Sequence, residues 1–181
     1  MMTLDARVEP LERVVDECAR VIFAGGAIVL PNDTSYCLAC DPYRCGVATE
    51  PLELLIASPA EFLEYARSNP LALLASKRLL PGPVTLIISK PAFLAPDVAP
   101  GAATIGVRVP DEPVARAILE RAGPLAAVAV TNGAAERADL TVENGPTRYE
   151  REATVVDLTG RHARIVREGA LEPERLAGLL R

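Results

Sequence analysis

The sequence has no apolar run that approaches the roughly 20 residues that a helix needs to cross a bilayer. Its first 20 residues carry five acidic side chains and lack the apolar centre of a secretory signal. It also has no internal repeat and no low-complexity tract. These absences argue against a membrane partner and against a repeat architecture, and we expect the chain to be cytoplasmic.

Positive charge is scarce as well. The net charge is −5, the isoelectric point is about 5.0, and Lys77 and Lys90 are the only lysines. Broad, salt-dependent binding to nucleic acid needs a basic surface, so the composition argues against it, although it is compatible with a local basic groove. The preference for arginine reflects either a GC-rich genome or a site that binds carboxylate or phosphate through forked hydrogen bonds.

The segments that are present fit one folded domain. The 181 residues are 50% hydrophobic, which suits a single domain over residues 1–181. Helical and strand patterns mix without strict alternation, and this predicts an α/β fold with a twisted mixed sheet and flanking helices. We predict strands at 27–30, 51–57, 84–89, 104–109 and 125–130, a hairpin of 153–158 with 163–169, helices over 11–26, from Ser58, from Asn69, from Asp111 and over 172–181, and a loop over 31–46.

The stretch PNDTSYCLACD, residues 31–41, bears on function because it leaves a buried strand and presents consecutive polar side chains. One interpretation, which we favour, is a ligand loop at the end of a strand. The other is a metal site on Cys37, Cys40 and Cys45, with Asp41 as a nearby fourth ligand, since structural zinc sites need four. The same cysteines could instead form a redox pair or serve as small buried side chains.

Segments spread along the chain resemble the YrdC-like family, the threonylcarbamoyl-AMP synthases. The first, GGAIVLPNDTSYCLACD at 25–41, is similar to the family pattern G-G-x-V-x-x-P-T-(D/E)-T-x-Y-G-L-x-C-D. The others, in collinear order, are PGPVTLI at 81–87, TIGVRVPDEPVARAIL at 104–119, GPLAA at 123–127, ATVVDLTG at 153–160 and IVREGAL at 165–171. The resemblance implies a YrdC-like domain with a concave, positively charged ligand cavity.

The resemblance also implies a reaction. Enzymes of this family join L-threonine, bicarbonate and ATP into threonylcarbamoyl-AMP and release pyrophosphate. A partner system then moves the threonylcarbamoyl group onto adenosine in tRNA, and members have been described as binding double-stranded RNA. We therefore expect a nucleotide or adenylate as ligand, tRNA or double-stranded RNA as partner, and ATP with Mg²⁺ if the family activity is retained.

Four residues of the opening loop match family positions. Thr34 and Tyr36 match polar residues near the family's threonine site, and Asp33 fills the acidic position. Asn32 replaces the usual threonine and can still form hydrogen bonds. The resemblance thus implies that these four residues bind substrate, whereas the alternative interpretation is that Asp33 and Thr34 only form a turn with their own backbone.

Three further candidates lie later in the chain. Arg108, in GVRVPD, matches a family arginine and is expected to pair with phosphate or carboxylate through two parallel bonds, unless it is an ordinary arginine at a strand end. Arg167, in VREGA, matches an arginine near the nucleotide. Asn132 could fill the asparagine position of the family's S-x-N motif only with a bulge, which the adjacent Gly133 would allow.

Several donors of the family pattern are missing from this chain. Family members carry a helix that ends in K-x-R-P before the strand predicted at 51–57, and roughly three turns of helix are absent here. Arg44 is the only cation nearby. Val128 and Ala129 stand where the S-x-N motif begins, and Ala153 replaces a family serine. One preorganised donor is worth on the order of 3 kcal/mol in a transition state, so we expect ordinary synthase activity to be reduced.

Three classes of function remain open at this point. The chain is a divergent enzyme that makes or consumes threonylcarbamoyl-AMP or a related adenylate. Alternatively, it is a non-catalytic module that binds a nucleotide, double-stranded RNA or a small carboxylate. The third interpretation is a metal or redox protein that uses Cys37, Cys40 and Cys45.

Overall fold

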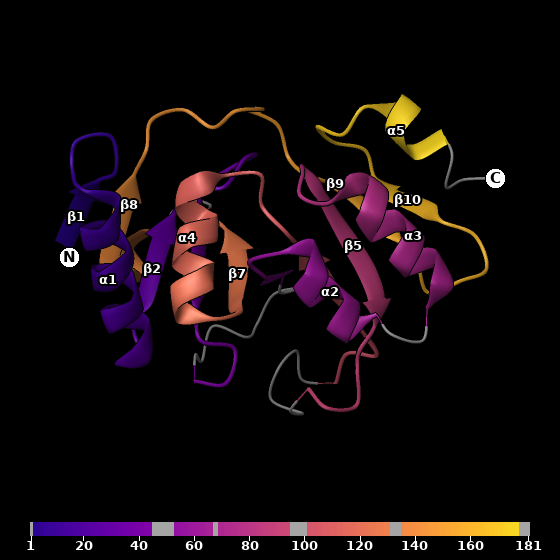
Figure 1. Cartoon of the computed structure of the whole chain (residues 1–181), viewed down its shortest axis with the longest axis horizontal. Coiled ribbons are helices and arrows are strands. Elements are labelled where there is room, and N and C mark those ends of the chain that lie inside the picture. Colours follow the sequence, from indigo (N-terminus) through magenta and orange to yellow (C-terminus); the bar gives the residue numbers. More distant parts are fainter. Residues whose placement is uncertain (1, 45–52, 67–68, 95–100, 131–134, 178–181) are drawn as a thin grey trace.

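The computed structural model describes residues 2–44, 53–66, 69–94, 101–130 and 135–177, and Figure 1 shows the course of the chain. Within these ranges no helix is long and apolar enough to cross a membrane. In chain order the elements are β1 (Met2–Asp5), α1 (Leu11–Phe23), β2 (Ala27–Leu30), β3 (Cys37–Cys40), β4 (Glu53–Leu55), α2 (Pro59–Tyr65), α3 (Pro70–Leu79), β5 (Val84–Ser89), β6 (Thr104–Arg108), α4 (Pro113–Ala122), β7 (Leu125–Ala129), the 3-10 turn η1 (Ala135–Arg137), β8 (Leu140–Glu143), β9 (Thr154–Asp157), β10 (Arg164–Arg167) and α5 (Pro173–Ala177).

The described strands form one mixed sheet. Its ten strands lie in the order β1-β8-β2-β3-β7-β4-β6-β5-β9-β10. Parallel pairing joins β1 to β8, β8 to β2, β4 to β6 and β5 to β9, and the remaining neighbours pair antiparallel. This arrangement confirms the predicted α/β fold with a mixed sheet, and the antiparallel pair β9–β10 confirms the predicted hairpin.

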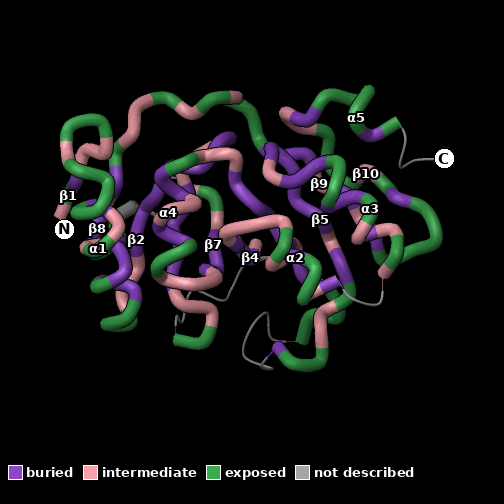
Figure 2. The backbone as a smooth tube through the Cα atoms, viewed as in Figure 1, coloured by how far each residue is buried: buried purple, intermediate pink, exposed green. Residues whose placement is uncertain are grey.

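Two large hydrophobic cores and one small one pack against the sheet. Helices α1 and α4 lie side by side over one half of it, and α2 and α3 lie over the other half (Figure 1). The first core contains Leu55 with Ile22 and Ile118, and the second contains Leu54 with Phe62. Because consecutive residues of a strand point to opposite faces, Leu54 and Leu55 place the two cores on opposite faces at β4. Figure 2 shows buried residues concentrated along the strands and the inner sides of the helices.

Two predicted helix starts are confirmed by their caps. The Ser58 side chain accepts a hydrogen bond from the Glu61 backbone nitrogen at 3.2 Å, at the start of α2. The Asn69 side chain accepts one from the Ala72 backbone nitrogen at 3.0 Å, at the start of α3. Each cap is followed by a proline in the first turn, where the missing N–H has no helical partner to lose.

The start of α4 differs from the prediction. Its cap is Glu112, whose side chain accepts a hydrogen bond from the Val114 backbone nitrogen at 3.1 Å. The predicted cap at Asp111 is wrong, because that carboxylate lies 2.6 Å from the Arg148 guanidinium. Because Asp111 pairs with Arg148, the next residue, Glu112, caps the start of the helix.

Residues 37–40 form strand β3, so the prediction of a loop over 31–46 is wrong in that part. All four residues are buried, and β3 lies between β2 and β7, with Cys37 opposite Leu30. Cysteine and alanine give little strand signal over so short a run, and the pairing on both sides decides the conformation. The connection between β2 and β3 therefore shrinks to residues 31–36.

Strands β1 and β8 were not predicted. Each has four residues with mixed burial, which is too short for a clear alternation. They exist because β1 pairs with β8, and β8 pairs in turn with β2. Pairing between segments so far apart in the sequence leaves no local signal.

Candidate functional site

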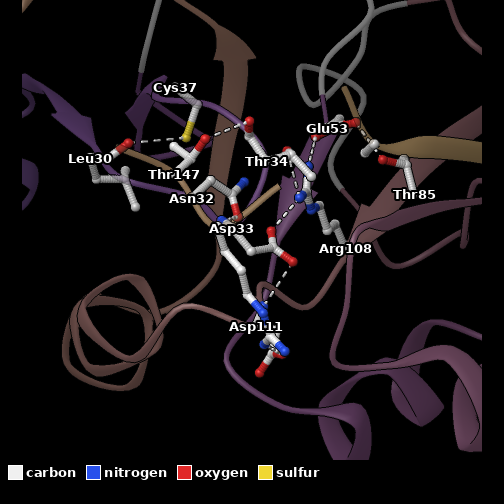
Figure 3. Close-up of polar contacts among 12 residues, drawn as sticks. Leu30, Asn32, Asp33, Thr34, Cys37, Glu53, Thr85, Arg108, Asp111 and Thr147 are labelled. Carbon is white, nitrogen blue, oxygen red and sulfur yellow. Dashed lines mark hydrogen bonds and ion pairs between the residues drawn. The ribbon is translucent and has the colours of Figure 1, made fainter. Parts of the chain in front are cut away.

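The loop of residues 31–36 turns inward between β2 and β3. Asn32, Asp33 and Thr34 are only 2%, 0% and 3% exposed. Burying polar side chains is costly unless hydrogen bonds replace the lost water. The loop therefore needs partners from elsewhere in the fold, and Figure 3 shows the strand residues and the later segment that supply them.

Arg108, at the end of β6, supplies the charge that balances this loop. It is 2% exposed, and its Nη2 atom donates hydrogen bonds to the Asp33 carboxylate and, at 2.8 Å, to the Thr34 hydroxyl. Its Nη1 atom lies 3.9 Å from the Glu53 carboxylate on β4. Its buried Nε makes no hydrogen bond within the described part of the chain. The guanidinium is thus fixed between two carboxylates of its own chain.

Both acidic partners of Arg108 are held from a second side. The other oxygen of Asp33 accepts a hydrogen bond from the Asp111 backbone nitrogen at 3.3 Å. Glu53 accepts one from the Thr85 hydroxyl at 2.5 Å, so β5 joins the network as well. The two carboxylates share the single cation of Arg108, and each has one further hydrogen-bond donor that stabilises its charge.

The segment 144–149, between β8 and β9, covers the loop from the other direction. In Figure 1 the chain between β8 and β9 crosses from one half of the molecule to the other. Four hydrogen bonds tie it to the loop. The Tyr36 hydroxyl donates to the Gly145 carbonyl at 2.7 Å and accepts from the Asn144 backbone nitrogen at 2.9 Å. The Thr147 hydroxyl donates to the Thr34 carbonyl at 3.0 Å, and the Tyr149 backbone nitrogen donates to the Asp33 carbonyl at 3.1 Å. The segment is therefore tied to the loop at Asp33, Thr34 and Tyr36.

Asn32 behaves as a turn former. Its side-chain oxygen accepts a hydrogen bond from the Asp33 backbone nitrogen at 2.9 Å, and its own nitrogen donates to the Ser35 carbonyl at 3.2 Å. The turn interpretation thus describes Asn32, whereas Asp33 and Thr34 use their side chains to bind Arg108. Direct ligand contacts by these residues stay a prediction.

The structure does not bring Arg167 to this cluster. Arg167 ends β10, the last strand of the sheet, and β5 and β9 lie between it and β6. Its guanidinium donates to the Ala153 carbonyl at 3.0 and 3.2 Å, and its Nη1 lies 3.3 Å from the Glu152 carboxylate. The other late candidate, Asn132, lies outside the described residues.

The cysteines do not assemble a metal site in the part of the chain that the structure describes, where no three His, Cys, Asp or Glu side chains group in that way. Cys40 is disulfide-bonded, which removes it as a thiolate ligand. Cys37 is a free thiol beside the Arg108 cluster, and Cys18 is a free thiol in the core that α1 covers. Cys45 lies outside the described residues.

Sequence reasoning missed several members of the cluster. Glu53 is the one whose role the sequence could have indicated. It lies inside the apolar run LELLIA, and a glutamate buried in such a strand needs a cation or a hydrogen-bond donor as partner. Thr85 and Thr147 carry no such signal, because a threonine in a strand or a loop is ordinary. Their roles follow only from the strand order and from the path of the 144–149 segment.

The chain matches a protein-family model and is similar in sequence to a human protein. A family model for Sua5, YciO and YrdC, described as "Telomere recombination", matches residues 20–169. The human threonylcarbamoyl-AMP synthase is 31% identical over 147 residues, which cover 74% of this chain and 52% of the human protein. The chain thus spans about half the length of that relative.

Two solved structures share the fold. P. abyssi Sua5 complexed with L-threonine superposes with a TM-score of 0.81 at 26% identity, over 99% of this chain and 61% of that one. YciO of E. coli superposes with a TM-score of 0.82 at 23% identity, over 96% of this chain and 97% of that one. All the loop and Arg108 contacts described above lie inside the region that the family model matches.

Arg108→Met should strongly destabilise the fold. The substitution leaves the Asp33 carboxylate buried without its cation, and such a loss lowers the free energy of unfolding by about 3–5 kcal/mol. Arg148→Met is the matched control, because its pair with Asp111 is exposed and should be worth no more than about 1 kcal/mol. Urea denaturation measures both changes, and equal losses in the two variants would contradict a structural role for the buried pair.

Cys37 should be unreactive in the native protein. Burial raises the pKa of its thiol from the usual 9.0 to about 12, so almost no thiolate forms at pH 8. Iodoacetamide labelling followed by peptide mapping should modify Cys37 in urea but not in buffer. The same shift predicts that the free energy of unfolding falls as the pH rises from about 9 to 12, because only the unfolded thiol then loses its proton. Rapid native labelling at pH 8 would show that the site is open.

Proposed function

The chain belongs to the Sua5–YciO–YrdC family, and we propose that it binds a nucleotide or adenylate related to threonylcarbamoyl-AMP beside the loop of residues 31–36, with little ordinary synthase turnover. The relative from P. abyssi, solved with L-threonine, and the human threonylcarbamoyl-AMP synthase support this choice of ligand. The aligned region includes the loop and Arg108.

The observation that carries the proposal is that the arginines next to the loop are already paired. Arg108 is held by Asp33 and Glu53, and Arg148 is held by Asp111. A triphosphate needs cations that are free to follow its developing charge. An adenylate carries a single phosphate linkage, so hydrogen bonds from a rigid loop can support it with fewer cations.

The missing family donors point in the same direction. The sequence lacks the K-x-R motif and the start of the S-x-N motif. Removing one preorganised donor slows a reaction by about 100- to 1000-fold, and the loss here involves more than one. Pyrophosphate release should therefore be far slower than in a family member that retains both motifs.

A ligand can contact only the partly exposed end of the loop, at Ser35 and Tyr36. Asn32, Asp33 and Thr34 are buried, while Ser35 and Tyr36 are partly exposed. In this proposal the buried residues fix the backbone of the loop, and Ser35 with Tyr36 presents it to the ligand. Preorganisation of this kind lowers the entropy lost on binding.

ATP and Mg²⁺ enter the proposal as substrate rather than as a resident cofactor. Within the described residues no carboxylate group is arranged to hold a metal, and Asp33 is occupied by Arg108. Magnesium would therefore arrive on the phosphates of ATP, as it commonly does in nucleotide sites. ATP, bicarbonate and threonine are cytoplasmic metabolites, so the proposed activity is cytoplasmic.

RNA is the alternative ligand. In the proposed pathway tRNA receives the threonylcarbamoyl group through a partner system, and direct binding of double-stranded RNA is a separate possibility for the same surface. A net charge of −5 offers little counterion release to drive it. We therefore place the adenylate first, ahead of RNA and of a small carboxylate alone.

Calorimetry and a pyrophosphate assay test the proposal together. The protein is incubated with ATP, Mg²⁺, L-threonine and bicarbonate beside a family member with intact motifs. We expect threonylcarbamoyl-AMP or AMP to bind with a Kd on the order of micromolar, while pyrophosphate release is at least about 100-fold slower than in the intact relative.

Tyr36→Phe, which removes the hydroxyl that ties the loop to Gly145, should weaken adenylate binding. Tyr149→Phe is the matched control.

The outcomes separate the alternatives. Absence of binding to adenylate, ATP and threonine would remove the proposal. Threonine-dependent release at the rate of the intact relative would show that the site has been rebuilt with other cations. Binding of double-stranded RNA without adenylate binding would favour the RNA interpretation.

A further inference from the structure

A cavity lies at the far end of the β5–β6 ladder from Arg108. Ser89 pairs with Thr104 at one end of this ladder, and Arg108 follows at the other end of β6. The cavity has a volume of about 290 Å³ and is formed between the α2–α3 corner, the end of β5 and the turn between β9 and β10. It is lined by Tyr65, Ala66, Asn69, Pro70, Ile88, Ser89, Thr159 and Gly160.

The described lining of this cavity combines polar, uncharged side chains with apolar ones. The hydroxyls of Tyr65 and Ser89 make no hydrogen bond with any residue that the structure describes. Asn69 uses one N–H of its amide on the Leu158 carbonyl at 2.7 Å, which leaves the second free. Free donors and acceptors from three segments thus converge on one small space.

Tyr65 combines an aromatic wall with a hydrogen-bond donor. Burial raises the pKa of its hydroxyl to about 12, so the hydroxyl keeps its proton at neutral pH. Its ring packs against Phe93 with 5.7 Å between the ring centroids, and Phe93 is 64% exposed. An aromatic face beside free hydroxyls is suited to a ligand with one apolar face and several polar groups.

The charges around the cavity disfavour anions. Thr159 donates its backbone nitrogen and its hydroxyl to the Asp157 carboxylate, which Arg164 pairs with at 2.9 Å. The carboxylate of Glu61 acts on Tyr65 from the α2 side. Among the residues that the structure describes, none that lines the cavity is a cation, and Arg164 is already paired with Asp157, so a phosphate or a carboxylate would find no free counter-charge in this lining.

We propose that this cavity binds the hydroxylated ring of a neutral sugar, either as a free monosaccharide or as the ribose of an uncharged nucleoside. Its volume lies near the lower limit of small-molecule pockets and suits a ligand of that size. The hydroxyls of Tyr65 and Ser89 and the free amide N–H of Asn69 bond the ring hydroxyls, and the Tyr65 ring packs on its C–H face. The site is independent of the adenylate proposed at the Arg108 cluster.

Titration with D-ribose, adenosine and AMP tests the site, with the methyl NMR signals of Ile88 and Ala66 as reporters. These residues line the cavity and belong to a hydrophobic cluster that includes no residue of the loop 31–36, so the readout is separate from adenylate binding there. We expect ribose or adenosine to shift both signals, and AMP to bind no more tightly than adenosine. Tyr65→Phe should weaken binding by about 3- to 10-fold through loss of one hydrogen bond.

Controls and outcomes complete the test. Ser89→Ala should weaken binding to a similar degree, while Tyr149→Phe, a tyrosine change away from the cavity, should leave the Kd unchanged. Equal affinity for ribose and adenosine would support a free sugar, and binding of adenosine alone would support a nucleoside. The proposal is overturned if neither ligand shifts the two signals, if AMP binds tenfold more tightly than adenosine at this site, or if Tyr65→Phe and Ser89→Ala bind like the parent protein.

Discussion

A buried ion pair between Arg108 and Asp33 joins two parts of the sheet that strand pairing leaves apart. Arg108 ends β6, Asp33 follows β2, and three strands lie between these two. Taking two charges out of water costs several kcal/mol per ion, and a pair recovers this only when further hydrogen bonds complete it. Thr34 and the Asp111 backbone nitrogen complete it here. The loop, the end of β6 and the segment 144–149 consequently behave as one unit.

The same pair limits what the loop can offer to a ligand. Its cation is used inside the protein, and both oxygens of the Asp33 carboxylate already accept a hydrogen bond, one from Arg108 and one from the Asp111 backbone nitrogen. Ser35 and Tyr36 are the partly exposed residues of the loop. The buried side chains of the loop and the segment 144–149 hold their backbone in place. Such a surface recognises shape and hydrogen-bonding groups better than it attracts dense negative charge, and this is the physical basis for placing an adenylate ahead of a triphosphate.

The sequence predicts those parts of the fold that depend on local chemistry. Caps at Ser58 and Asn69 mark helix starts because a side-chain oxygen and a nearby proline suffice. Strand β3 was not predicted, because pairing with the strands on both sides determines the conformation of its four residues. The polar loop was recognised, but Glu53 and the segment 144–149 were not, since only the strand order brings them to it. The resemblance implies that Arg167 lies near the nucleotide, and the structure places β5 and β9 between its strand, β10, and β6.

Native-state amide hydrogen exchange tests most directly whether the Arg108–Asp33 pair makes the loop a rigid part of the fold. The amides of Asp33, Asp111 and Tyr149 all donate to Asn32 or Asp33 within this unit. If the unit is rigid, these three amides exchange only on global unfolding, with the same protection as the amides of β3. Fast exchange at the three amides while β2 and β3 stay protected would contradict this account, because it would show that the loop opens without breaking the sheet.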